Sequence, residues 1–187
     1  MTHFVVEGKS DKVFLEQYMR YKNPTFKYEI IENNGNELQD STLQYIKKAL
    51  DNSHRVCIIF DADLDYNQTR QSIENKIIDL EYKNKVEIFL FPNNKNKGNL
   101  ETLLSHIAKH KEIIECFEKY VECIKFQSKD FADNIDKKSK MYAYREASGL
   151  EKNIKSNKNT MNENIFSQYF KFDSPYLQPL HSFIFNL

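Results

Sequence analysis

The chain has 187 residues, which is enough for one domain with its own core and short for two. Its 27 Lys and Arg residues balance 27 Asp and Glu residues, so no whole-molecule charge favours nucleic acid or a membrane surface. Three cysteines without CxxC spacing favour buried or free thiols in a reducing compartment over a disulfide framework, and no stretch resembles a signal peptide or a membrane span. We therefore expect a cytoplasmic protein that does not bind membranes.

Four segments rich in β-branched and aromatic residues predict strands. They cover residues 3–8, 27–33, 55–63 and 85–92. Each is followed by apolar residues at helical spacing, which predict helices over 10–22, 40–52, 69–83 and 98–124. Asp40 or Ser41 is expected to cap the second helix. Four strand–helix units in series predict an α/β fold, with a mostly parallel four-stranded sheet flanked by helices.

The pattern weakens after residue 126. Residues 136–149 (DKKSKMYAYREASG) predict a basic helix, and the polar residues 150–164 predict a mobile loop. Residues 165–187 are dense in Phe, Tyr and Leu, which would form a large apolar patch in water unless they dock on the rest of the chain. We therefore expect a single domain over 1–187, with a core at about 1–126 and a docked aromatic-rich extension over 127–187.

The letters Gly8-Lys9-Ser10 match the end of a nucleotide-binding P-loop. Such a loop needs another glycine five residues before Gly8, so that the chain can curl around a phosphate, and this position is His3 in a predicted strand. We therefore discount a P-loop. The neighbouring acidic residues Glu7 and Asp11 carry more information.

Acidic side chains follow three of the predicted strands. They are Glu7, Asp11, Asp61, Asp63 and Glu101. Ligands of a parallel sheet gather at the carboxyl ends of its strands, so these side chains are expected to converge there. Crowded carboxylates take up protons unless a cation is present, and oxygen-only ligands favour Mg²⁺ or Mn²⁺ over zinc. Taken singly, each has an ordinary helix-terminal or strand-end role, so the hypothesis of a metal site rests on the joint arrangement.

At these residues the sequence resembles the Toprim domain, the metal-binding catalytic fold of topoisomerases, bacterial primases and several small nucleases. Its signature, a glutamate and glycine after the first strand, an acidic residue four places later and a DxD after the third strand, is matched by Glu7-Gly8, Asp11 and Asp61 with Asp63. The segments GNLE at 98–101, KKSKMYAYR and SPYLQPLHSFI also resemble small stand-alone Toprim-like proteins of poorly defined function. The resemblance covers nearly the whole chain.

This resemblance implies Mg²⁺-dependent phosphodiester chemistry on DNA or RNA. The five acidic residues would hold one or two ions, with Glu7, Asp61 and Asp63 acting in catalysis. Lys138, or else Lys140, would neutralise charge that develops on the phosphate, although a solvated basic face is equally consistent with both. The residues expected to contact the nucleic-acid backbone are Lys9, Lys95, Lys97, Lys138, Lys140 and Arg145.

Several activities stay open. The chain has no room for the accessory domains of a topoisomerase or primase, which favours a small nuclease of phage defence or of RNA or DNA processing, with or without a protein partner that supplies substrate binding. FDADLD also resembles haloacid-dehalogenase phosphatases, with Asp61 as nucleophile and Asp63 as acid–base, although their DxD follows the first strand. A non-catalytic metal- or nucleotide-binding regulatory module is the third alternative.

Two pairs on the predicted long helix receive structural interpretations. His106 and His110 lack the adjacent glutamate of a metalloprotease motif. Cys116 and Cys123 are expected to share the buried face of that helix.

Overall fold

The structure, a computed structural model, describes residues 1–79, 83–136, 138–156 and 164–185. The chain divides into two compact units. The first unit comprises Met1–Leu103 and Asp173–Leu187, and the second comprises Leu104–Phe172. The boundary expected near residue 126 therefore falls inside a helix of the second unit, α5 (Lys111–Gln127).

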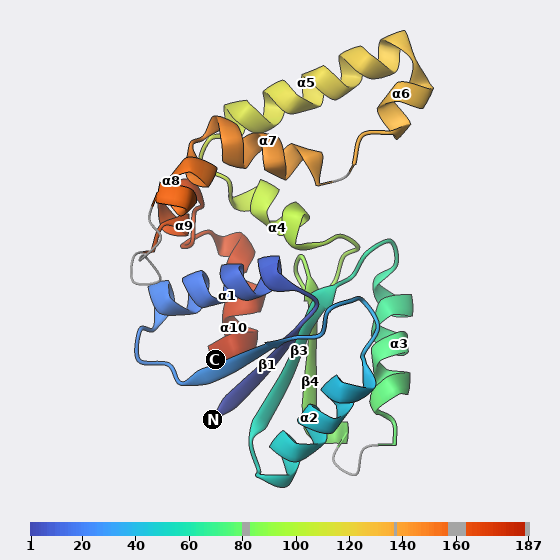
Figure 1. Cartoon of the computed structure of the whole chain (residues 1–187), viewed down its shortest axis with the longest axis vertical. Coiled ribbons are helices and arrows are strands. Elements are labelled where there is room, and N and C mark those ends of the chain that lie inside the picture. Colours follow the sequence, from blue (N-terminus) through green and yellow to red (C-terminus); the bar gives the residue numbers. More distant parts are fainter. Residues whose placement is uncertain (80–82, 137, 157–163, 186–187) are drawn as a thin grey trace. The chain divides into compact units, whose positions relative to one another are not determined.

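A parallel four-stranded sheet forms the centre of the first unit (Figure 1). Its strands are β1 (Thr2–Val6), β2 (Tyr28–Glu32), β3 (Arg55–Asp61) and β4 (Val86–Phe91), in the order β2-β1-β3-β4. The register places Val6 beside Glu32 and Ile59, and Asp61 beside Phe91. This confirms the predicted α/β class, and it brings the carboxyl ends of all strands to one edge.

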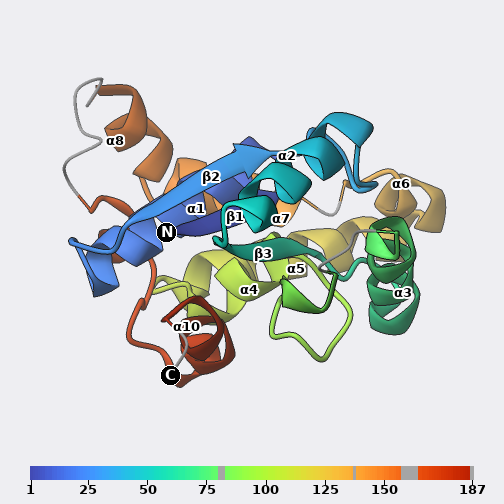
Figure 2. The same cartoon turned by 90° about the horizontal axis from the view of Figure 1, so that it is seen from below.

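Helices cover both faces of this sheet (Figures 1 and 2). On one face, α2 (Asp40–Asp51) and α3 (Tyr66–Ile77) bury an aliphatic core that includes Ile58 and Leu90. On the other face, α1 (Lys9–Lys22) and α10 (Gln178–Phe185) pack aromatic rings against the sheet. The ring centroids of Phe89 and Phe183 lie 5.2 Å apart. Alternate residues of a strand point to opposite faces, so each central strand needs apolar residues at nearly every position.

Two predicted helix starts are corrected. Helix α2 begins after Gln39 with no side-chain cap, so neither Asp40 nor Ser41 caps it, and Asp40 instead places its charge in the first turn. Helix α3 begins earlier than predicted, because Asp65 Oδ1 accepts the N–H groups of Asn67 and Gln68 at 2.9 and 3.0 Å. It ends at Ile77, and a short 3-10 helix, η1 (Lys83–Lys85), precedes β4.

The prediction of one long helix over 98–124 was wrong. The segment forms α4 (Leu100–Ile107) and α5, with a break at Ala108. The break arises because Ile107 O accepts the N–H of Lys171 at 2.7 Å and Lys109 N–H donates to Tyr169 O at 2.9 Å. A segment distant in sequence thus replaces the helical hydrogen bonds, and His106 and His110 do not share a helix.

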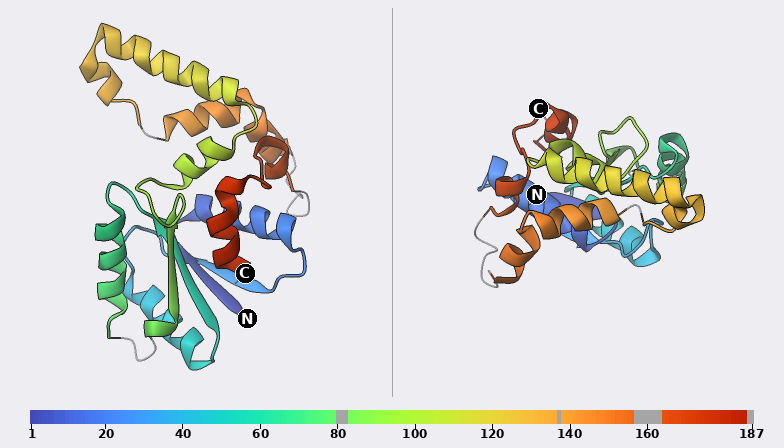
Figure 3. Two further views of the ribbon diagram at one scale, coloured as in Figure 1. Left: turned by 180° about the vertical axis from the view of Figure 1, so that it is seen from behind. Right: turned by 90° about the horizontal axis from the view of Figure 1, so that it is seen from above.

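The second unit is helical and contains, besides α5, the helices α6 (Lys129–Asp133), α7 (Ser139–Ala147), α8 (Leu150–Ser156) and α9 (Phe166–Tyr169). Helices α5 and α7 lie side by side, with α6 at their far end (Figure 3). The basic helix predicted over 136–149 is confirmed as α7. The loop predicted over 150–164 is partly wrong, because its first residues form α8, whereas 157–163 lie outside the described residues. Cys116 and Cys123 are exposed, since α5 turns Ile114 inward instead.

The end of the chain returns to the first unit through η3 (Pro175–Leu177) and α10. Arg55 holds this segment, because its guanidinium donates to the carbonyls of Phe183 and Ile184 at 2.5 and 2.7 Å. The same group binds both carboxylate oxygens of Glu87 at 2.7 Å. In the described part of the chain, no helix has the length and apolar character that a membrane span requires.

Arg55→Met should destabilise the fold. The variant leaves the Glu87 carboxylate and two helix-terminal carbonyls without their donor, so we expect the free energy of unfolding to fall by about 2–4 kcal/mol. The melting temperature, followed by circular dichroism, should drop by roughly 5–15 °C. Arg70→Met is the control, because the Arg70–Glu74 pair is a half-exposed i,i+4 contact within α3, worth under about 1 kcal/mol. Equal shifts in both variants would contradict the assignment.

Candidate metal and catalytic site

Glu7 and Asp61 meet at the carboxyl edge of the sheet. Glu7 follows β1 directly, and its Oε1 accepts the backbone N–H of Asp61, the last residue of β3, at 2.8 Å. The contact is possible because β1 and β3 are adjacent and parallel. Residues distant in sequence are thereby joined at the place where parallel α/β sheets bind their ligands.

The Asp61 side chain points to the amino end of α4. Its Oδ1 accepts the N–H of Leu100 at 2.9 Å. Asn99 shapes this helix start, since its Oδ1 accepts from the backbone N–H of Thr102 at 2.9 Å and from the hydroxyl of Thr102 at 2.8 Å. Glu101 lies in the same first turn. The positive end of the helix dipole therefore faces Asp61, which favours a negative charge there.

Asp11 occupies a buried position at the start of α1, with 8% of its surface exposed. Its Oδ2 accepts the N–H of Gly8 at 3.0 Å. Gly8 has an extended backbone (φ −159°), and Gly8-Lys9-Ser10 leads directly into α1. This segment does not curl as a P-loop does, and its structural role is to place Asp11 and Glu7.

The carboxylates act on one another electrostatically. Burial, followed by the charges of Glu7 and Asp11 and more weakly Glu101, raises the pKa of Asp61 to about 9, against the opposing effect of the Leu100 N–H. Asp61 therefore holds a proton at neutral pH unless a cation compensates the neighbouring charges. Oxygen donors of this charge fit a hard divalent ion such as Mg²⁺ or Mn²⁺.

The oxygens are not arranged as a finished coordination sphere. Within the described ranges, no group of three or more Asp, Glu, His or Cys side chains is placed to hold a metal ion. Glu7, Asp11 and Asp61 are instead directed at backbone N–H groups. Each of these hydrogen bonds uses one oxygen of its carboxylate, so a cation at this edge would bind through the lone pairs that remain.

Asp63 lies at the rim of the site. Its side chain is exposed, its backbone is left-handed (φ 51°), and its carbonyl accepts the N–H of Gly98 at 2.9 Å. This contact ties the turn after β3 to the segment that precedes α4. Asp65, two residues further on, is the exposed cap of α3.

The predicted basic residues fall in both units. Lys9, at the start of α1, and Lys95 and Lys97, in the loop after β4, are exposed in the first unit. The second unit contains Lys138, Lys140 and Arg145. Lys140 pairs with Glu118 and Arg145 with Glu151, each at 2.7 Å, so both have structural partners. Lys138 is exposed at the start of α7, where its N–H binds Asp136 Oδ1 at 2.6 Å.

Some groups that shape the site were missed by sequence reasoning. The Leu100 N–H has no side-chain signature, and only the Gly98-Asn99 pair before it hinted at a helix start. Asn33, which organises the loop after β2, is the last residue of the strand predicted over 27–33 and was given no role in the site. Its signal would have been a polar residue directly after a strand that ends at the edge where Glu7 lies.

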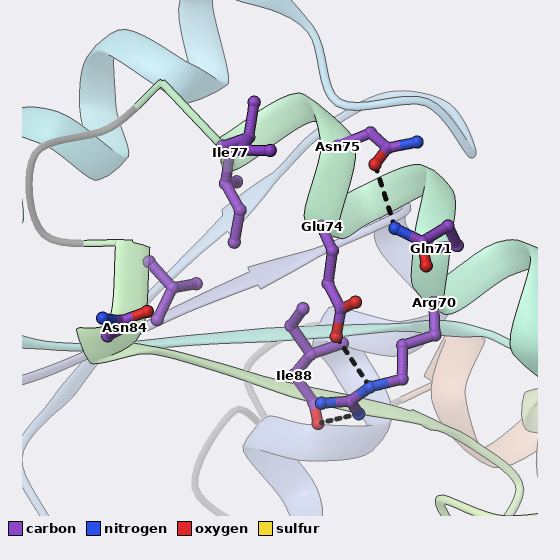
Figure 4. A pocket seen from close by; sticks show the side chains of 9 residues that line it. Arg70, Gln71, Glu74, Asn75, Ile77, Asn84 and Ile88 are labelled. Atoms are coloured by element: carbon purple, nitrogen blue, oxygen red, sulfur yellow. Dashed lines mark hydrogen bonds and ion pairs between the residues drawn. The ribbon is translucent and has the colours of Figure 1, made fainter.

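A pocket of about 350 Å³ lies between α3 and β4, away from the carboxylates (Figure 4). Its lining residues are Arg70, Gln71, Glu74, Asn75, Ile77, Ile78, Asn84, Val86 and Ile88. Val86 and Ile88 come from the first half of β4, whereas Asp61 lies beside the last residue of that strand. Arg70 and Glu74, both on α3, bind each other at 2.9 Å along one wall of the pocket (Figure 4). The pocket does not contribute to the carboxylate site.

Fold and site together define a parallel α/β protein with an acidic cluster at the carboxyl edge of its sheet. The chain belongs to DUF3226, a family of proteins of unknown function, whose family model matches residues 2–187. No curated protein and no solved structure matches the chain.

The raised pKa of Asp61 predicts a specific pH dependence of stability. Unfolded aspartate has a pKa of about 4, so between about pH 4 and pH 9 the folded protein holds a proton that the unfolded chain has released. The free energy of unfolding should therefore fall as pH rises through this range. Asp61→Asn keeps the acceptor for Leu100 N–H and removes the charge. It should melt more than about 3 °C above wild type at pH 8 without divalent ions.

Melting curves between pH 5 and pH 8 check this, and the advantage of the variant should shrink toward the acidic end. Asp65→Asn is the control for loss of a charge, because asparagine preserves the α3 cap. Curves of wild type and Asp61→Asn that stay parallel over the whole range would contradict the assignment.

Gly98 should tolerate no side chain. Its φ of +136° disfavours L-residues, and a Cβ would lie 3.0 Å from Thr102 Oγ1 and 3.2 Å from Pro92 Cδ. Gly98→Ala should cost about 1–3 kcal/mol of stability, measured by urea unfolding, and should displace the start of α4. Gly8→Ala is the matched control, since a Cβ there meets only Asp11 Oδ2 at 3.9 Å. A neutral Gly98→Ala would refute this account of the loop.

Proposed function

We propose that this chain is a small Toprim-type nuclease that hydrolyses phosphodiester bonds of DNA or RNA with Mg²⁺ or Mn²⁺. The observation that carries the proposal is the Glu7–Asp61 contact, with Asp11 and Glu101 close enough to raise the pKa of Asp61. Like charges from separate segments gathered at a strand-end edge are difficult to explain by folding stability, because their repulsion opposes folding. Carboxylate oxygens are also the ligands that a hard divalent ion takes.

The residues that would hold one or two ions are Glu7, Asp11, Asp61, Asp63 and Glu101. When bound, such ions polarise a phosphate and lower the pKa of a coordinated water. A haloacid-dehalogenase-like phosphatase or a metal-binding regulatory module would use the same carboxylates. The carboxylates therefore support metal binding more strongly than they support any one reaction.

The chain's own groups have distinct proposed roles. Asp61 is the half-buried anchor, because its Oδ1 accepts the Leu100 N–H at the amino end of α4, which partly offsets the rise of its pKa. Glu7 is oriented by the Asp61 N–H. Asp63 is exposed at the rim, where its carboxylate oxygens can accept the proton of an attacking water.

The substrate contacts proposed in the first unit are Lys9, Lys95 and Lys97, which are exposed and suit phosphate oxygens. Lys138, Lys140 and Arg145 are proposed as further contacts. Lys140 and Arg145 would have to release Glu118 and Glu151, their partners in the structure, to bind a phosphate. A protein partner would supplement this limited set of cations. The free thiols Cys57, Cys116 and Cys123 fit action in the reducing cytoplasm.

Cleavage assays test the proposal. Single- and double-stranded DNA and RNA should be cut with Mg²⁺ or Mn²⁺ and left intact with EDTA. Asp61→Asn and Glu7→Gln, which keep the shapes of the carboxylates, should each lower the rate at least about 100-fold because the ion loses a charged ligand.

Asp65→Asn is the control for these variants, since it removes an exposed carboxylate nearby and preserves the helix cap. It should cleave at the wild-type rate. Hydrolysis of small phosphomonoesters without nucleic-acid cleavage would favour the phosphatase alternative. Mn²⁺ binding without turnover of either substrate would favour the regulatory module.

A further inference from the structure

The pairing of β1 with β2 continues past the ends of both strands with one extra residue. Asn33 N–H donates to Val6 O at 2.7 Å, which follows the register of Val6 and Glu32. The next bond runs from Gly35 N–H to Glu7 O at 3.2 Å, so one more residue has been inserted on the β2 side. Asn34 takes up the insertion in a left-handed conformation (φ 60°). This two-against-one arrangement is like that of a β-bulge but lies beyond the ends of both strands, and it is called the bulge below.

The Asn33 side chain holds the bulge and the loop that follows. It is 2% exposed. Its Nδ2 donates to the carbonyls of Gly35 and Glu37, each at 2.7 Å, and its Oδ1 accepts the N–H of Gln39 at 3.0 Å. A buried amide with three such bonds fixes the loop over 33–39 in one conformation, because each bond would otherwise leave a polar group unsatisfied.

This loop connects Asn33 to the carboxylate cluster. The carbonyl of Gly35 accepts a hydrogen bond from the Asn33 side chain, and the N–H of Gly35 donates to the carbonyl of Glu7. Glu7 in turn directs its side chain to the Asp61 N–H. The backbone of Glu7 therefore depends on a loop whose shape Asn33 determines.

We propose that Asn33 is a positioning residue for Glu7, acting through the loop over 33–39 and without contact to substrate or ion. The proposal deepens the proposed function and rests on it for its metal-binding consequence. Its structural part, the control of the Glu7–Asp61 contact, stands on the hydrogen bonds alone. Partners of metal ligands of this kind typically change metal affinity by 10–100-fold when removed.

Amide hydrogen exchange gives a readout that needs no metal. In Asn33→Ala, the Asp61 N–H should exchange at least about 10-fold faster than in wild type, because its acceptor Glu7 loses its fixed backbone. The Leu100 N–H is the internal reference, since its acceptor is Asp61 itself and it should change less than about twofold. Asn36→Ala, an exposed position in the same loop, is the matched control and should leave both amides unchanged.

Mn²⁺ titration followed by water-proton relaxation gives the second readout. Asn33→Ala should weaken Mn²⁺ binding about 10-fold or more at a temperature at which circular dichroism shows it fully folded, whereas Asn36→Ala should not. Asn33→Asp, which keeps the oxygen acceptor and loses both donors, provides the same comparison of amides if the alanine variant does not fold.

The outcomes separate this proposal from the proposed function. If hydrogen exchange of the Asp61 and Leu100 amides is accelerated equally, the loosening is general and the positioning role is overturned. If neither amide exchanges faster, Asn33 is not coupled to Glu7 and the role is overturned as well. A wild-type chain that binds no Mn²⁺ would overturn the nuclease, and the exchange comparison would still decide the role of Asn33. Selective exposure of the Asp61 amide, with weakened Mn²⁺ binding, would support both.

Discussion

The site depends on the crowding of several carboxylates at one partly desolvated edge of the sheet. Burial makes the negative form of Asp61 costly, and the charges of Glu7, Asp11 and, more weakly, Glu101 add to that cost. A fold selected only for stability would place an uncharged residue there. The scaffold instead supplies N–H groups to the acidic oxygens, through Asp61, Gly8 and Leu100, and so keeps the charges close together.

That arrangement follows from the parallel sheet. All strands run in one direction, so their carboxyl ends lie at the same edge. This alone brings together the residues after β1, the end of β3 and the start of α4. The details come from short polar segments at the same edge. Asp63 and Gly98 tie two turns together, and the loop over 33–39 supports Glu7 from the β2 side. The carboxylates and the turns that support them therefore come from different segments at the same edge.

The order of strands and helices could be predicted from sequence, because periodicity and strand-end punctuation are local signals. The convergence of Glu7 and Asp61 followed from the parallel topology. The break between α4 and α5 could not be predicted, since Ile107 and Lys109 bond to residues 169–171, far along the chain. The burial expected for Cys116 and Cys123 failed for a related reason, because which face of α5 is covered depends on its partner helix. Backbone donors such as Leu100 N–H leave no trace in residue type.

The first unit is discontinuous, and this has a consequence for synthesis. Its sheet is complete by Phe91, but α10, which covers the aromatic face through Phe183 and is held there by Arg55, follows the whole second unit in the sequence. Translation therefore delivers α10 only after residues 104–172. Until then Phe89 lacks the Phe183 ring that packs on it in the folded protein, so the nascent chain exposes apolar surface at this face for longer than at the face that α2 and α3 cover.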